Sequence, residues 1–572
     1  MMLRKIFTFF LFALPVLAGA FFLHRYGVNV LLMDEFAFVP LVTSDHLPNF
    51  ADLFRQHNEH RILFPQIVYF FLAKASAMNS LAAMWASFTL VVILYGMALW
   101  QLSRQVSGPL MWCAGFLLGC ALFYPSQWEN SLWGFQLAFY MTFVFAILAI
   151  LSFQMAWDKD RASVFGWWLA LALAAAVIAS FSSIQGLLTW LVIALIWFIA
   201  AGEKALTEKT FWLWLAVAVA VWLLYFHGYT KPAHHPKLTT VFSMPMDGQE
   251  YVLALFGAAF GWPESPLLIG ALGTLILGGA AAVMAVFVRI CWIGQPAGLF
   301  AVGVIVYSFL CGLSIAVGRS GFGWQQALTS RYYTFTLAMV WGIVLYLAVW
   351  PGGNQTGAKR LAAFFCFAFI AATMAIGLPH TLANAEAFKN QNLLRQYYLR
   401  TADWQSDNNL RTLLPDPGAV RLYAARLRER NYNAFAGLTV PDWRVIEHID
   451  VPNDFPLVLD QATIRSDTLS LRGWCFDPYA GKPARSIWLN LGAKRFLLFS
   501  GVSRLGVARI LKNEALAFAG FTADIPLGAV PLGDFPLRFA VIGADGNKLY
   551  EVTKDIRLVH DADGARLERY GR

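Results

Sequence analysis

Long apolar segments alternate with short polar connections over the first two thirds of this chain. About eleven of these segments have the length of a membrane-spanning helix, which needs roughly 20 residues to cross the hydrocarbon core. They lie at roughly residues 6–23, 81–101, 109–123, 135–156, 163–181, 187–201, 211–227, 265–288, 296–316, 334–350 and 361–378. The pattern predicts a polytopic α-helical membrane domain over residues 1–378.

Hydropathy falls after residue 378, and two further regions follow. Residues 379–454 contain basic, amphipathic stretches, which predict a helical extracytoplasmic linker. From about residue 455, short alternating runs such as DTLSLRGWCF and FPLRFAVIG are separated by Gly, Pro and Asp turns. This second pattern predicts an antiparallel β-sandwich over residues 455–572.

Basic residues set the expected orientation of the helices. Arg4 and Lys5 place the N-terminus in the cytoplasm, and the first apolar segment is interpreted as an uncleaved anchor rather than a signal peptide. The apolar stretch 61–77 either spans the membrane or lies on its outer surface. Only the surface helix keeps the later basic loops in the cytoplasm, so we expect that arrangement. The stretch 250–262 predicts a second surface or re-entrant helix.

Composition agrees with a membrane protein and excludes several classes. The 572 residues are 58% hydrophobic and 13% charged, about half the charged share of a soluble domain. The net charge of +9 is spread over short loops and the C-terminal region, with no basic block interleaved with aromatic residues, so we expect no nucleic-acid partner. The six cysteines show no zinc or disulfide spacing. We predict no metal ligands by residue, although a divalent metal cofactor remains open.

The expected topology places the unusual polar residues on the outer side. The outer loops are MDEF (33–36), HNEHRILFPQ (57–66), YPSQWENSLWGFQ (124–136), FSSIQG (181–186), YTKPAHHPK (229–237) and GRSGFGWQQALTSRYY (318–333). The interiors of the spans carry almost no charge, whereas an ion-coupled carrier places ionisable groups near the bilayer midplane. The one-sided pattern therefore predicts an active site built from outer loops.

Asp34 and Glu35 form an acidic pair where the first helix would leave the bilayer. Two adjacent carboxylates are costly to desolvate at that depth, which favours a chemical role over a simple solvated helix end. A carboxylate can accept the proton of a hydroxyl group that attacks a substrate. We expect Asp34 to act as this base, with Glu35 orienting the acceptor or helping to hold a metal.

The segment HNEHR supplies further candidates. On a helix, His57 and His60 would share one face and could bind a divalent metal. The sequence shows no complete set of metal ligands, which favours a hydrogen-bonded cluster as the role of His57. Glu59 and His60 are candidate substrate-binding residues. Arg61 is a candidate phosphate ligand, with an interfacial anchor as the alternative.

Two arginines and a tyrosine flank the glycine-rich loop at 318–333. Guanidinium groups bind phosphate bidentately, and a glycine-rich turn lets backbone N–H groups approach an anion. Positive charge on the outer side runs against the usual topogenic preference, which favours a lipid phosphate over a snorkelling anchor. Arg319, Arg331 and Tyr332 are therefore candidate donor-phosphate ligands.

Aromatic residues surround one more carboxylate. Glu129 lies between Trp128 and Trp133, an arrangement that suits a sugar ring, although tryptophan is also common in an interfacial belt. We add Gln185, in the FSSIQG loop, to these candidate substrate-binding residues.

Together these segments resemble the GT-C superfamily of polyprenyl-phosphate-dependent membrane glycosyltransferases, such as the lipid A aminoarabinose transferase and the protein O-mannosyltransferases. MDEFAFVPLV matches the acidic start of their outer loop, and EHRILFPQIVYFFLAKASAMN matches their second surface helix. The resemblance covers residues 1–378 and implies that Asp34 is the catalytic base. A DXD motif is missing from the later outer loops, which departs from the family and puts a tightly bound metal in doubt.

The C-terminal run LRGWCFDP…FSGVSRLGVARI…AGFTADIPL is similar to sandwich modules appended to some bacterial glycosyltransferases. That similarity implies a bacterial inner membrane protein with its C-terminal domain in the periplasm.

The expected function is transfer of a sugar from a polyprenyl-phosphate donor to a cell-envelope glycan or glycolipid on the periplasmic face. The sequence contains no Rossmann-type fingerprint, which would have indicated a nucleotide-sugar donor. Direct attack on the donor would invert the anomeric centre. Arg331, with Arg319 or Arg61, would stabilise the departing phosphate. The alternatives are a lipid-linked sugar flippase or exporter, an acyl- or phosphoethanolamine-type transferase, and a non-catalytic scaffold for envelope assembly.

Overall fold

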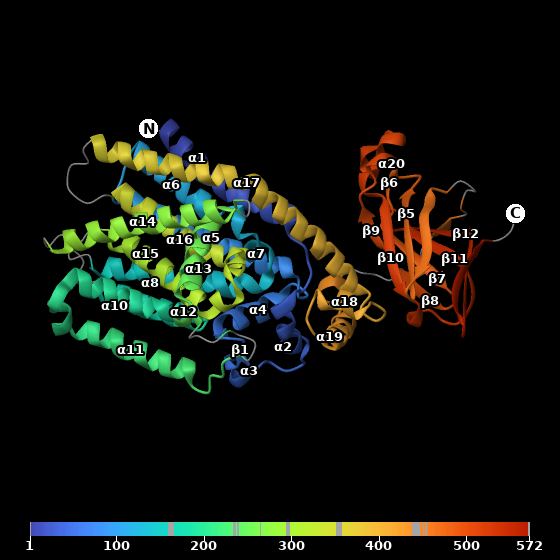
Figure 1. The fold of residues 1–572 in the computed structure, drawn as a ribbon, viewed down its shortest axis with the longest axis horizontal. Coiled ribbons are helices and arrows are strands. Elements are labelled where there is room, and N and C mark those ends of the chain that lie inside the picture. The colour runs from blue at the N-terminus through green and yellow to red at the C-terminus, as the bar shows by residue number, and fades with distance from the viewer. Residues whose placement is uncertain are drawn as a thin grey trace. The chain divides into compact units, whose positions relative to one another are not determined.

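The computed structural model describes residues 2–157, 165–232, 236, 240–262, 265–292, 298–349, 357–436, 447–449, 451 and 455–569. The chain divides into two compact units (Figure 1). The helical unit comprises Met1–Asn29 and Pro40–Asn390, and the C-terminal unit comprises Val30–Val39 and Gln391–Arg572. Each unit is described by itself.

The long helices follow the predicted apolar segments. They are α1 (Met2–Tyr26), α5 (Ser80–Ser103), α6 (Pro109–Leu122), α8 (Leu137–Trp157), α9 (Phe165–Ser180), α10 (Leu188–Ala201), α11 (Lys209–Phe226), α14 (Pro266–Trp292), α15 (Leu299–Arg319), α16 (Tyr333–Val349) and α17 (Gly357–Arg400). Within the described residues, ten segments are long and apolar enough to cross a membrane, and α9 is a shorter apolar helix. The chain is a multi-pass helical membrane protein, as predicted.

Two of the shorter helices are too short to cross a bilayer. α4 (Leu63–Ala75) and α13 (Pro245–Gly257) each have 13 residues, a length of about 20 Å. The hydrocarbon core is about 30 Å thick. α4 therefore has the length expected of the predicted surface helix at 61–77. α13 begins before the predicted stretch 250–262 and continues into the 3₁₀ turn η7 (Ala258–Phe260).

Helices α8 and α16 form the centre of the helical unit. In their most apolar windows, 83% and 89% of the residues are buried, against 22% for α1 and 28% for α11. α8 packs along α9, and α16 packs along α15. A helix that is apolar on all sides is either enclosed by protein or exposed to lipid. The outer helices therefore present their exposed apolar faces to the bilayer.

The last long helix extends past its predicted end. The hydropathy predicts a span that stops at 378, but α17 continues through Pro379 to Arg400. The fall in hydropathy marks the place where the side chains become polar, while the backbone remains helical. The division between the two compact units falls after Asn390, within this helix.

The C-terminal unit contains short helices followed by two β-sheets. The helices are α18 (Asp407–Arg411) and α19 (Pro417–Glu429), followed by the 3₁₀ turn η11 (Asn433–Phe435). The strands are β3 (Glu447–Ile449), β4 (Leu457–Arg465), β5 (Thr468–Asp477), β6 (Lys482–Pro483), β7 (Ser486–Leu491), β8 (Lys494–Leu497), β9 (Phe499–Val502), β10 (Gly520–Pro526), β11 (Gly533–Ile542), β12 (Lys548–Asp561) and β13 (Gly564–Arg569).

These strands form the predicted sandwich. One sheet has the order β4-β5-β10-β9 with β6 paired to β5, and the other has the order β13-β12-β11-β7-β8 with β3 paired to β12. All described pairings are antiparallel except that of β3 with β12. Buried residues from both sheets, such as Leu471, Phe521, Leu489 and Phe539, share one core. The alternation of apolar and polar residues along each strand places these side chains on the inner faces.

Short elements between the long helices carry the polar residues. They are η1 (Met33–Phe38), α2 (Val39–Thr43), α3 (Phe50–Phe54), β1 (Gln56–His57), β2 (His60–Arg61), η2 (Pro125–Gln127), α7 (Trp128–Leu132), η3 (Gly134–Gln136), η5 (Ile184–Leu187), η6 (Gly202–Thr207), α12 (Thr240–Ser243), η8 (Ser320–Phe322), η9 (Trp324–Leu328) and η10 (Ser330–Tyr332). In the helical unit, α3, β1 and α7 lie at one end and the N-terminus lies at the other (Figure 1).

Candidate functional site

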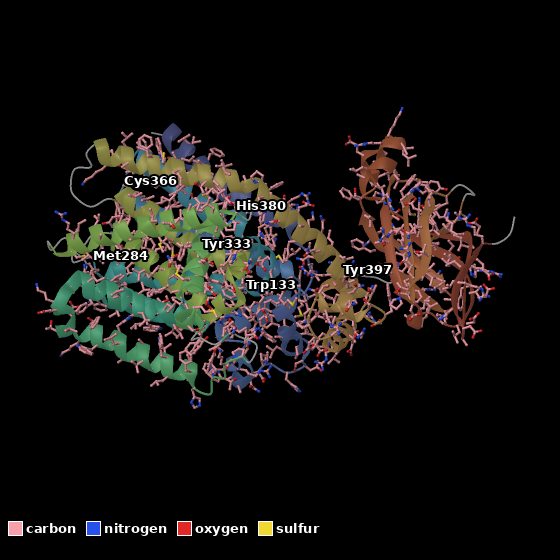
Figure 2. All side chains as sticks on the ribbon, viewed as in Figure 1. Trp133, Met284, Tyr333, Cys366, His380 and Tyr397 are labelled. Atoms are coloured by element: carbon pink, nitrogen blue, oxygen red, sulfur yellow. The ribbon has the colours of Figure 1, made fainter. Side chains whose placement is uncertain are left out.

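Five of the predicted outer loops meet within the helical unit. Gln56 bonds to Thr230, Ile184 to His60, Arg319 to Glu59, and Arg331 to Glu129. We call the segments 54–61, 127–136, 181–186, 225–230 and 318–333 the loop cluster. Trp133 and Tyr333, at the edges of two of these segments, are labelled in Figure 2. The sequence predicted these loops to share one side of the membrane, and the structure brings them into contact.

The segment 56–61 is a β-hairpin rather than a helix. β1 and β2 pair with His57 opposite His60, and Asn58 in the connecting turn has a φ of 49°. Asparagine tolerates this left-handed conformation better than most residues. The helical spacing assumed for His57 and His60 is therefore wrong. The His57 ring instead packs 5.2 Å from Phe135, between ring centroids.

Arg61 holds this hairpin against the end of α11. Its Nε donates to the carbonyl of Tyr225 at 2.6 Å, and its Nη1 donates to that of Phe54 at 2.9 Å. Nη2 donates to the carbonyl of His227. The guanidinium carbon lies 4.7 Å from the centroid of the Phe54 ring, and the residue is 6% exposed. Three N–H groups of Arg61 are thus committed to backbone carbonyls, which indicates a structural role; its role as a phosphate ligand stays a prediction.

Glu59 joins the hairpin to the glycine-rich loop. Its Oε1 pairs with Nη2 of Arg319 and lies 3.7 Å from Nε2 of His60. The backbone N–H of Ile184 donates to Nδ1 of His60 at 3.2 Å. Because Nδ1 accepts this bond, a neutral His60 carries its proton on Nε2, which faces Glu59. Glu59, His60 and Arg319 form one connected polar group.

The backbone around Arg331 is fixed from both sides. Its N–H donates to Oε2 of Glu129 at 3.0 Å, and its carbonyl accepts from Nδ2 of Asn130 at 2.8 Å. The hydroxyl oxygen of Ser330 accepts from the N–H of Glu129 at 3.1 Å. Asn130 also donates to Thr334, whose hydroxyl donates to Gln127. The half-buried side chain of Arg331 therefore projects from a rigid backbone.

A chain of hydrogen bonds through two tyrosines lies close to the two arginines. The hydroxyl of Tyr251, from α13, donates to Gln326, whose Nε2 donates to the hydroxyl of Tyr332 at 2.8 Å. Burial raises the pKa of Tyr251 well above its usual range, and the charges of Arg319 and Arg331 partly oppose that shift. Tyr251 therefore stays a neutral donor close to both arginines.

The aromatic candidates and Gln185 pack into the protein. Trp128 contacts Phe388 of α17, with 4.8 Å between ring centroids, and Trp133, 5% exposed, lies 5.7 Å from Phe135. Oε1 of Gln185 accepts from the hydroxyl of Ser183 at 2.9 Å. These contacts hold the loops in place, so a sugar-binding role for the three residues stays a prediction.

Asp34 and Glu35 belong to the C-terminal unit, whereas the other candidates belong to the helical unit. The N–H of Met33 donates to the carbonyl of Leu413 at 2.8 Å, and Phe36 stacks on Tyr423. Glu35 is fully buried, and its Oε2 accepts from the N–H of Leu32 at 3.2 Å. Asp34 is half-buried. This docking on α18 and α19 has no signal in the sequence.

Sequence reasoning also missed two buried polar atoms of the loop cluster. Among the described residues, neither the hydroxyl of Ser320 nor Oδ1 of Asn130 has a hydrogen-bond partner. Ser320 follows Arg319 and is 5% exposed. Buried polar atoms are usually paired, so an unpaired one is a natural contact for a polar ligand. Within the described part of the chain, no three His, Cys, Asp or Glu side chains gather as a metal-ligand set.

An apolar groove of about 610 Å³ lies between α1, α6 and α17. Its lining includes Phe116, Phe123, Tyr124 and Phe367. The Tyr124 hydroxyl is already bonded to the carbonyls of Phe260 and Met374. Pro125, the first residue of η2, is one of the lining residues, and η2 packs against η10, the turn that contains Arg331. The groove has the size of a small-molecule pocket and adjoins the loop cluster.

No protein-family model, curated protein or solved structure matches this chain.

Proposed function

We propose that this chain is an integral membrane glycosyltransferase that moves a sugar from a polyprenyl-phosphate donor to a cell-envelope glycan or glycolipid. The observation that supports the proposal is the fixed backbone of Arg331 in η10, which packs against η2, the turn that contributes Pro125 to the lining of the apolar groove. A lipid phosphate needs an apolar site for its chain and a cation for its head group next to each other. The proposal places the reaction on the periplasmic face of a bacterial inner membrane, with GT-C-like chemistry.

In this proposal the acceptor hydroxyl attacks the anomeric carbon of the donor and the bond to the lipid phosphate breaks. Asp34 takes the hydroxyl proton, and the anomeric centre inverts. Arg331 stabilises the negative charge on the departing phosphate, because a guanidinium fork matches its oxygens. Arg319 adds positive charge nearby and is held by Glu59.

The polar residues at one end of the helical unit favour transfer over transport. A flippase or exporter for a lipid-linked sugar needs a polar route across the bilayer. The central helices α8 and α16 are instead almost completely buried in apolar packing. This observation makes transport the second candidate.

The proposal is tested with the full chain in lipid nanodiscs. Binding of undecaprenyl phosphate is measured by native mass spectrometry, and transfer is measured with a panel of undecaprenyl-phosphate sugars and an envelope-lipid extract as acceptor. We expect Arg331→Ala to weaken lipid-phosphate binding at least tenfold. The matched control is Arg289→Ala, which removes an exposed arginine in the last turn of α14.

Equal binding by the Arg331→Ala and wild-type proteins would contradict the phosphate assignment. If sugars move across proteoliposome membranes while no transfer product forms with any donor of the panel, the transporter replaces the transferase.

A further inference from the structure

Most of the exposed large apolar side chains of the β-sandwich lie at one of its ends. Within residues 455–569, seven large hydrophobic side chains are exposed, and five of them lie at this end. They are Tyr479, Leu505, Ile510, Leu511 and Phe518, and Ile510 is 81% exposed. We call these five residues the apolar tip. Scattered exposed leucines need no explanation, but a gathered set marks an interaction surface.

A helical insertion between β9 and β10 builds most of this tip. α20 (Leu505–Ile510) and the 3₁₀ turn η12 (Glu514–Phe518) pack against each other, and the N–H of Arg504 closes the insertion on the carbonyl of Ala517 at 2.7 Å. Ala508, Leu516 and Ala519 form a small core of its own beside Phe476. The insertion therefore folds on inward-facing residues, and its exposed side chains are not needed for that packing.

The turn that carries Tyr479 belongs to the same end. Nδ2 of Asn513, between the two helices, donates to the carbonyl of Gly481 at 2.8 Å. β6 follows this turn and contacts η12. Figure 1 shows α20 and β6 at the same end of the sandwich.

Positive charge surrounds the apolar tip. Lys482, Arg509 and Lys512 are exposed beside it, and Glu514 is the exposed acid in the same segments 479–482 and 505–518. Exposed apolar side chains next to lysine and arginine are typical of protein surfaces that enter the head-group region of anionic membranes. A protein partner would equally cover apolar side chains, but it would not by itself explain the positive rim.

We propose that the apolar tip docks on the surface of an anionic lipid bilayer. The apolar side chains would enter the boundary between head groups and acyl chains, and the three cations would contact lipid phosphates. The domain is covalently joined to membrane-spanning helices, so even a weak surface affinity is effective at the high local concentration of lipid. This inference is independent of the proposed transferase activity.

The test attaches a fluorophore to the apolar tip of the full-length protein in nanodiscs. An NBD group is attached to Ile510→Cys in a background where the six native cysteines are alanine, and quenching by doxyl-labelled phospholipid is measured. The control is Asp563→Cys, in the exposed turn between β12 and β13. We expect at least twofold quenching at position 510, stronger with 30% phosphatidylglycerol than with none, and no quenching at 563.

Two further measurements keep the inference falsifiable. Arg509→Glu combined with Lys512→Glu should abolish the dependence on phosphatidylglycerol. If the cysteine-free chain does not fold, a benzophenone amino acid at position 510 of the native-cysteine chain should crosslink to lipid. An unquenched probe at 510, or quenching only of the control, would overturn the proposal. So would crosslinking of position 510 to a protein instead of lipid.

Discussion

Replacement of Arg61 by lysine tests whether this residue holds the hairpin or binds substrate. The guanidinium donates to three backbone carbonyls from three different nitrogens. Lysine has a single nitrogen, so we expect one of these bonds to survive and two to be lost. Each bond from a charged donor contributes about 1.5 kcal/mol, so the loss is about 3 kcal/mol for local opening of the hairpin. That value corresponds to a factor on the order of 100 in the opening equilibrium.

Hydrogen exchange followed by mass spectrometry measures this opening directly. Peptides covering residues 54–61 and 225–230 should exchange on the order of 100-fold faster in Arg61→Lys, since both sides of the contact are released. Arg289→Lys, an exposed arginine in α14, is the matched control. Unchanged exchange in both peptides would refute the structural role. Lipid-phosphate binding that falls in Arg61→Lys without faster exchange would instead support the role of a phosphate ligand.

Three further predictions concern the sandwich. Asp477→Ala should lower the free energy of unfolding of the sandwich by at least about 3 kcal/mol in a denaturant titration, because three backbone N–H groups and the Tyr550 hydroxyl lose their acceptor. Asp524→Ala is the control, because it removes only an exposed hydrogen bond from Ser470 and should lower the free energy of unfolding much less. Burial raises the pKa of the Cys475 thiol far above its usual range, so iodoacetamide at pH 8 should alkylate it only after denaturation, as read by peptide mass spectrometry. Hydrogen bonds from Arg566 hold the pKa values of Asp561 and Glu568 below their usual range, so these groups stabilise the β12–β13 hairpin above the ordinary carboxyl pKa of about 4. This stabilisation is lost as the pH falls through the lowered values, so amide exchange in a peptide covering residues 556–569, corrected for the intrinsic exchange rate, should speed up only below about pH 4.

The long helices could be predicted from the sequence because hydropathy reports directly on the surrounding solvent. The predicted segment 187–201 became Leu188–Ala201, and 334–350 became Tyr333–Val349. The same signal failed at the end of α17, where lipid gives way to water but the backbone stays helical. Hydropathy locates the edge of the membrane, whereas the end of a helix depends on capping residues and on contacts.

The loop cluster was only partly predictable. Successive helices cross the membrane in opposite directions, and this was enough to predict that the five polar loops lie on the same side. The pairing of Glu59 with Arg319, or of Arg61 with the carbonyl of His227, joins residues far apart in the chain. Such contacts depend on tertiary packing and leave no local pattern. One weak local signal was available, since Asn58, the first residue of the turn between β1 and β2, is of a type that tolerates a positive φ.

The acidic pair provides the sharpest test of the proposed chemistry, since its two carboxylates are adjacent in sequence but differ in environment. Glu35 is fully buried, and its carboxylate accepts the N–H of Leu32; Glu35→Gln keeps an oxygen for that bond and should retain most transfer activity. Asp34 is half-buried, so an acceptor hydroxyl can approach it. Like Glu35→Gln, Asp34→Asn removes one negative charge, but it also removes the proposed base. It should therefore lower kcat by at least a hundredfold with little effect on lipid-phosphate binding. If Asp34→Asn keeps full activity, or if both variants lose it equally, Asp34 is not the base.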